Sequence, residues 1–174
     1  NDDDTDDDTD GDTDDDIDDD TDDDTDDDTD DDTDCLAARQ HGIVVVAAAG
    51  NSASSSPEYP AGEKVAGVLA VAASTVNDTL AAFSNYGAWV TVAAPGEQIT
   101  SSVPGGGYGV WSGTSMAAPI TAGVAALVRA TDPRLSPPAV VNLIRATAVN
   151  INGPVPKRLD AIALLTLAAA APNS

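Results

Sequence analysis

The sequence predicts an α/β fold in which a partial parallel sheet is flanked by helices and preceded by a disordered, Asp-rich tail. Three short runs of small and β-branched apolar residues, at 42–49, 68–73 and 89–94, are typical of strands buried on both faces. Helical patterns accompany these runs, and strands that alternate with helices favour a parallel sheet covered on both sides. The first 34 residues differ sharply, because they contain 24 Asp and no Lys, Arg or Glu.

The acidic segment is a repeat, and its regularity marks a domain boundary. Residues 2–33 divide into eight tetrads, six of which read Asp-Asp-Asp-Thr, and Ile17 is their only large apolar residue. Such a chain has nothing to bury against its conformational entropy, and its charges repel one another. We therefore expect residues 1–34 to be disordered and 35–174 to fold. The second part holds 6 acids and 7 bases, so the net charge of −23 belongs to the tail.

A calcium site is one interpretation of the repeat, and two others concern its origin. Asp6, Asp8 and Asp10 precede Gly11 as in the calcium loop of an EF-hand, but Ile17 stands where that loop needs a bidentate carboxylate. Only weak, diffuse cation binding is expected from it. A four-codon DNA repeat read one base out of frame would encode a Thr/Pro linker instead. The segment is thus either a genuine acidic tail or an out-of-frame linker.

The strands follow one another with clear stop signals. A helix is expected to end over 36–41, and the strand at 42–49 is broken by Gly50-Asn51. A Ser-rich loop leads to the strand at 68–73, and Pro95-Gly96 stops the strand at 89–94. The segments 99–103 and 108–112 flank a Gly-rich turn, which predicts a hairpin.

Three helices complete the domain. The segment 115–130 consists of small residues and must be closely packed, with Pro119 expected in its first turn. The segment 136–146 is amphipathic, with Ser136 as N-cap and Pro137 at the first helical position. A terminal helix is expected over 159–171.

Several classes of function lack support in the sequence. No basic patch with interleaved aromatic residues exists, so nucleic-acid binding is not expected. Cys35 is the single cysteine, which excludes an internal disulfide. No apolar run reaches membrane-spanning length, and no secretory signal is visible.

Two motifs carry a specific chemistry. Gly-Thr-Ser-Met-Ala-Ala-Pro at 113–119 places a serine in the first turn of a helix, where unpaired N–H groups and the helix dipole favour a developing oxyanion. Val-Val-Val-Ala-Ala-Ala-Gly-Asn at 44–51 is a buried strand that ends in an amide side chain. In this order and at this separation, the two motifs resemble those of subtilisin-like serine proteases, the subtilase family. The resemblance covers about residues 37–165, the C-terminal half of such a catalytic domain.

The resemblance implies roles for individual residues. Ser115 would be the acyl nucleophile, and Asn51 would donate its side-chain amide to the tetrahedral intermediate. The peptide bond from Tyr59 to Pro60 would be cis in many members. The substrate would be a peptide or protein, no cofactor is implied, calcium is possible in the intact parent, and that parent would be secreted or in the cell envelope. Residues implied to line the substrate site are Ala47, Ala48, Ala49, Gly50, Gly113 and Thr114.

The catalytic base is missing from these motifs. The triad also needs a histidine and a carboxylate, which the family carries in its N-terminal half. His41, the single histidine, precedes the first strand, and Asp160 resembles a helix start. Neither is expected to serve. We therefore expect a truncated or frame-shifted, inactive fragment of a serine endopeptidase, or alternatively a non-catalytic, acidic-tailed binding module that reuses the half-domain.

Overall fold

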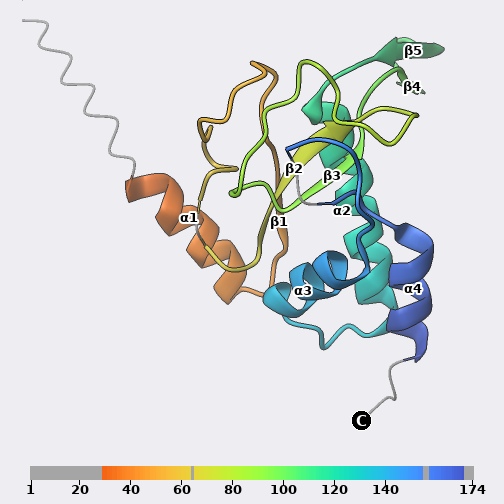
Figure 1. Cartoon of the computed structure of the whole chain (residues 1–174). Helices are drawn as coiled ribbons and strands as arrows, with labels where there is room; N and C mark the ends of the chain where they lie inside the picture. The colour runs from red at the N-terminus through yellow and green to blue at the C-terminus, as the bar shows by residue number, and fades with distance from the viewer. Residues whose placement is uncertain (1–28, 64, 155–156, 171–174) are drawn as a thin grey trace, which may run out of the picture.

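A computed structural model describes residues 29–63, 65–154 and 157–170, with side chains from residue 33 onward. The expected disorder of residues 1–28 lies outside this range. Four helices and five strands occur in the described residues (Figure 1). They are α1 (Thr29–Gln40), β1 (Val45–Ala48), β2 (Val68–Ser74), β3 (Val92–Pro95), β4 (Ile99–Ser102), β5 (Tyr108–Trp111), α2 (Thr114–Thr131), α3 (Pro137–Thr147) and α4 (Ala161–Ala170).

The three apolar runs form the expected parallel sheet. Its order is β1-β2-β3, with Val45 paired to Val68 and Val71 paired to Val92. The central strand β2 is buried along its whole length, as predicted for a strand covered on both faces. The carboxyl ends of β1 and β3 lie at one end of this sheet, where the chain turns into the loops that carry Asn51 and Gly96.

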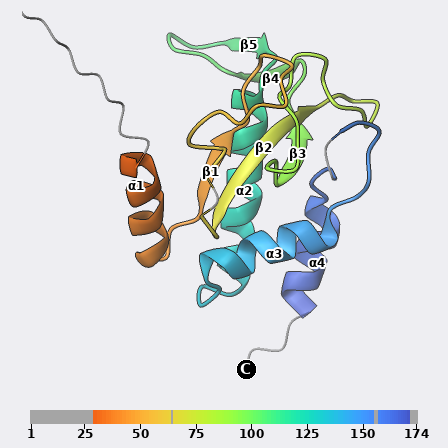
Figure 2. The same ribbon diagram turned by 60° about the vertical axis from the view of Figure 1, so that its left-hand side comes forward.

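The two faces of the sheet are covered differently. Alternate β2 residues Leu69 and Val71 pack with Val124 and Val128 of α2 and with the buried side of α3 and α4. Figure 2 shows the ribbon of α2 running behind β2. The opposite face presents Ala70 and Ala72, which pack against Ala61, Val90 and the indole of Trp89. Small side chains on this second face let irregular loops approach the sheet directly.

The helices form for local reasons that the sequence indicated. In α3, Ser136 is the N-cap, its hydroxyl accepts a hydrogen bond from Ala139 N at 3.4 Å, and Pro137 follows at the first position. In α4, Asp160 Oδ1 accepts from Ala163 N at 2.9 Å. The prediction for Pro119 was wrong: α2 begins at Thr114, so this proline lies inside the helix and removes the donor that would bond the carbonyl of Ser115.

Helix α1 extends from the folded part into the acidic segment. It begins at Thr29, so residues 29–34 of the acidic segment are helical. Acidic positions form its N-terminal half and Arg39 lies in its last turn, which is the charge order that a helix dipole favours. Cys35 is buried, and α1 contacts β1, which anchors the helix beside the sheet (Figures 1 and 2).

Strand β1 is shorter and less buried than predicted. It lies at the edge of the described sheet, and its Val45 and Val46 are only half-buried, whereas burial on both faces was expected. The strands β4 and β5 form the predicted antiparallel hairpin, which projects from the carboxyl end of the sheet (Figure 1). Within the described residues, no helix is both long and apolar enough to cross a membrane.

Candidate active site

A surface depression brings the two predicted functional residues together. It has a volume of about 420 Å³ and lies between the loop after β1 and the first turn of α2. Ser115 and Asn51, 64 positions apart in the chain, both contribute to it. The other residues that line it are Trp111, Ser112, Gly113 and Met116.

The amide of Asn51 is oriented by Thr114. Asn51 Oδ1 accepts one hydrogen bond from Thr114 N at 2.9 Å and another from Thr114 Oγ1 at 3.1 Å. Thr114 Oγ1 in turn accepts from Gly50 N at 3.1 Å. Because the amide oxygen is occupied by donors, the amide nitrogen faces the other way, and it has no partner among the described residues. Asn51 therefore presents a free N–H donor beside Ser115.

Ser115 supplies a second free donor. Its backbone N–H lies in the first turn of α2, where an intrahelical partner is impossible, and no other described residue bonds to it. Its hydroxyl is exposed and also unpaired within the described residues. The two N–H donors, at the positive end of a helix, can together stabilise an anion that forms on a carbonyl attacked by this hydroxyl.

The nucleophile segment is tied to the sheet through Gly96. Gly113 N donates to Gly96 O at 2.7 Å, and Gly96 N donates to Ser74 O at 3.1 Å. A Cβ placed on Gly96 would lie 2.6 Å from Ala73 Cβ and 2.9 Å from Gly113 O. Close backbone contact at this position thus links the end of β2 to the start of α2.

A buried polar network, which sequence reasoning missed, supports the Asn51 loop. Asn85 is completely buried, and its Oδ1 accepts from Ser52 N at 2.9 Å and from Ser54 N at 3.0 Å. Its Nδ2 donates to Ala49 O at 2.9 Å and to Glu58 Oε1 at 2.7 Å. All four bonding positions of this amide are occupied, so its orientation is fixed. The sequence signal that could have located Asn85 is the polar pair Ser84-Asn85, which lies between two apolar strand segments.

The predicted substrate wall is placed mostly inside the fold. Ala47 and Ala49 are buried, and Ala48 is half-buried. Gly50 has a φ of 100°, and a Cβ there would overlap Glu58 and Asn85. Gly113 lines the depression, while Thr114 is buried and supports Asn51. Contact of these residues with substrate stays a prediction. The bond from Tyr59 to Pro60 is cis, as the resemblance implied.

No base accompanies Ser115 within the described residues. His41 is exposed in the turn after α1, where its N–H bonds Ala37 O, and Asp160 caps α4. Both positions agree with the structural roles expected for them. The described residues also contain no group of three or more His, Cys, Asp or Glu that could hold a metal ion.

Comparison of the sequence with known proteins points to the same chemistry as this site geometry. The sequence profile of the subtilase family of peptidases matches residues 5–163, a range that begins within the acidic repeat. Alkaline elastase YaB of Bacillus sp. is 44% identical over 114 residues, which cover 66% of this chain and 30% of that protein. Subtilisin Savinase of Lederbergia lenta is 42% identical over 115 residues, which cover 66% and 42%.

Solved structures agree with the sequence relatives. A protease from Pseudoalteromonas arctica superposes with a TM-score of 0.74 at 32% identity, covering 79% of this chain and 46% of its own. The patellamide maturation protease PatA superposes with a TM-score of 0.71 at 32% identity, covering 79% and 55%. The chain thus spans between 30% and 55% of the length of these four proteins.

Proposed function

Because the chain belongs to the subtilase family, we propose that it carries the nucleophile and oxyanion donors of a serine endopeptidase and needs a base from another polypeptide segment. The observation that carries this proposal is that Ser115 and Asn51 line the same depression, with the Asn51 amide held in a fixed orientation and its N–H group free among the described residues. Peptide bonds are the proposed substrate, as the names of the matched proteases suggest.

In the proposed reaction, Ser115 Oγ attacks the carbonyl carbon of the scissile peptide bond. Its proton passes to the base as the new C–O bond forms. The negative charge that develops on the carbonyl oxygen is met by Asn51 Nδ2 and by the Ser115 N–H. Collapse of the intermediate breaks the C–N bond, and the base returns the proton to the leaving amine. Water then hydrolyses the acyl-enzyme ester.

The chain by itself is proposed to be inactive. The single histidine, His41, lies in a surface turn at the far end of β1 from Asn51, and a serine hydroxyl without a base is a weak nucleophile. This agrees with the inactive-fragment hypothesis. The alternative, a non-catalytic binding module, is equally consistent with a missing base. An experiment must therefore distinguish the two hypotheses.

Complementation separates them. The N-terminal part of Subtilisin Savinase, which this chain does not match, is fused to the N-terminus of the chain. Hydrolysis of a chromogenic peptide by the fusion is then measured. We expect Ser115-dependent turnover and fluorophosphonate labelling in the fusion, neither in the unfused chain, and neither in a Ser115→Ala fusion. A fusion that melts cooperatively but shows no Ser115-dependent turnover would contradict the peptidase proposal and favour the binding module.

A further inference from the structure

A second, larger groove lies away from Ser115, between α3 and the segment that leads into β2. One part is a cavity of about 640 Å³, and an adjoining part measures about 410 Å³. The two parts share Ala88, Thr91 and Arg145, so they form one continuous groove. Its size is in the range of sites that bind small organic ligands.

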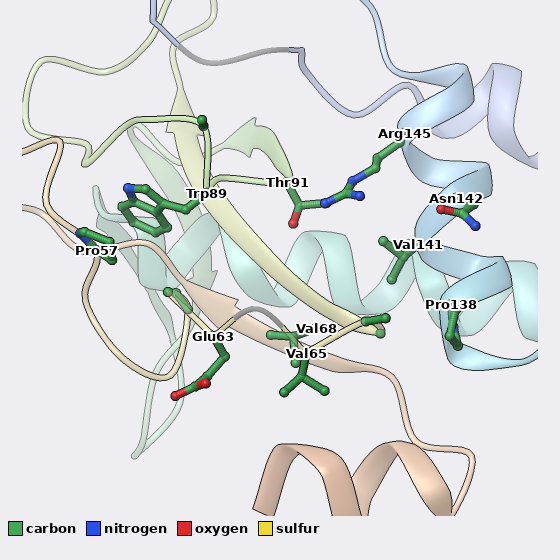
Figure 3. A pocket seen from close by; sticks show the side chains of 15 residues that line it. Pro57, Glu63, Val65, Val68, Trp89, Thr91, Pro138, Val141, Asn142 and Arg145 are labelled. Carbon is green, nitrogen blue, oxygen red and sulfur yellow. The ribbon is translucent and has the colours of Figure 1, made fainter. Parts of the chain in front are cut away.

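The larger part has a rigid apolar wall. Trp89 Nε1 donates to Ser55 O at 3.0 Å, which fixes the indole ring. Val65, Val68 and Val141 line the same cavity, so an apolar side chain placed there would be covered by aromatic and branched groups (Figure 3). A preformed surface of this kind costs little ordering when a ligand binds.

The smaller part is positively charged without compensation. Arg145 and Lys157 both line it, and neither side chain has a hydrogen bond or ion pair with any described residue. By contrast, Arg134 pairs with Asp132, and Arg158 pairs with Asp78. The carboxylate of Glu63 is turned away from Arg145, whose guanidinium extends from α3 toward Thr91 (Figure 3). Glu63 lines the larger part, where its Oε1 is buried without a hydrogen bond within the described part of the chain, so an anion is attracted to the other end of the groove, where Arg145 and Lys157 lie.

We propose that this groove binds the C-terminal residue of a peptide whose last side chain is apolar. The terminal carboxylate accepts from Arg145, whose guanidinium can bond both oxygens, and is attracted by Lys157. The apolar side chain lies against Trp89 and Val141. The exposed amide of Asn142, which also lines the cavity, is available to the peptide group. None of these residues lines the Ser115 depression, so this site does not depend on the proposed peptidase function.

The fluorescence of Trp89 tests the proposal on the chain itself. The Trp111→Phe variant leaves Trp89 as the only tryptophan, since the sequence has 2. At low micromolar concentration it is titrated with N-acetyl-Leu-Leu and with the corresponding C-terminal amide. We expect a saturable change with the acid and at least fivefold weaker binding of the amide. Octanoate, a carboxylate without peptide groups, is expected to bind less tightly than the dipeptide acid.

Variants assign the binding to the groove. Arg145→Gln and Lys157→Gln are each expected to weaken binding of the acid by roughly threefold to fivefold, the effect of one exposed charge pair, without changing binding of the amide. Arg134→Gln, a surface arginine outside the groove, and Ser115→Ala are expected to bind like the parent. Equal binding of acid and amide, no effect of Arg145→Gln, or no saturable change would each overturn the proposal. Octanoate binding as tight as that of the dipeptide would overturn the assignment to a peptide.

Discussion

At the scale of single residues, Thr114 is the side chain that joins the two halves of the site. It is completely buried, and its hydroxyl accepts from Gly50 N while donating to Asn51 Oδ1. The resemblance implied that Thr114 contacts substrate, which stays a prediction, and the motif alone gives no information on which way its side chain points. Its hydrogen bonds indicate that it positions the amide of Asn51.

Replacing this hydroxyl should lower turnover more than substrate affinity. Thr114→Val keeps the shape of the side chain but removes both hydroxyl bonds, so Asn51 is held only by Thr114 N. We expect kcat of the complemented protease to fall by about fivefold, since one hydrogen bond contributes about 1 kcal/mol, with KM little changed. Thr114→Ser restores the hydroxyl and should act like the parent. Equal losses in both variants would assign the effect to packing.

Removing the Asn51 amide should cost more. For Asn51→Ala we expect a loss of roughly 10²–10³ in kcat, a value carried over from the equivalent amide of subtilisin, a member of this same family. The measurement is steady-state turnover of the complemented protease, with melting temperature as the check on folding. A loss below threefold would mean that this amide does not face the developing oxyanion.

Asn85 should control the stability of the Asn51 loop. Asn85→Asp keeps the acceptor for Ser52 N and Ser54 N but places a carboxylate against Glu58 Oε1 and Ala49 O. A buried donor is lost and two like charges meet, so we expect about 2–4 kcal/mol lower stability at neutral pH in urea unfolding. Adding Glu58→Gln supplies a new donor and should recover part of the loss. An additive double mutant would contradict this coupling.

At the scale of elements, Gly96 links the end of β2 to the segment that leads into α2. The sequence indicated the order of strands, the hairpin and the helix caps, because apolar runs, Gly and Pro are local signals. It did not indicate that Ala73 of β2 lies in close contact with Gly96, which in turn is hydrogen-bonded to Gly113, since this depends on how the elements meet. Nor did it locate Asn85, whose side-chain partners all lie in the single segment 49–58, which is distant from Asn85 in the sequence.

A methyl group at Gly96 should separate these elements. Gly96→Ala would overlap Ala73 and Gly113 O, so we expect a loss of about 1–3 kcal/mol and a displaced Ser115. Gly123→Ala, in α2, is the matched control: a Cβ there meets nothing within 4 Å, and alanine should stabilise the helix by about 0.5–1 kcal/mol. Urea unfolding of both variants gives the comparison. Equal effects would show that the Gly96 contact can relax.

At the scale of the whole molecule, one edge of the sheet is incompletely covered. The sequence indicated the half-domain and its strands, and an exposed apolar edge at the strand over 43–49 follows from the expectation that the other half of the sheet is missing. In the described residues β1 and β3 are the two edge strands; Val92, Ala93 and Ala94 of β3 are buried, whereas β1 is covered only in part by α1. Parallel strands are normally buried on both faces, and an apolar edge is a site for association between chains. The half-buried Val45 and Val46 therefore mark the surface that complementation should cover.

This edge should make the unfused chain associate with itself. Ile43, just before β1, is 54% exposed, and Ile43→Lys should reduce light scattering of the unfused chain, because a charge at an edge opposes pairing between chains. Val76→Lys is the matched control, since Val76 is 94% exposed in the loop beyond the opposite end of the sheet. It should leave scattering unchanged. When both are fused to the Savinase segment, Ile43→Lys and the parent should scatter light equally. The fused Ile43→Lys variant should, however, melt at a lower temperature than the fused parent. If both lysine variants scatter equally, association occurs through another surface, and β1 is not the edge that a second segment covers.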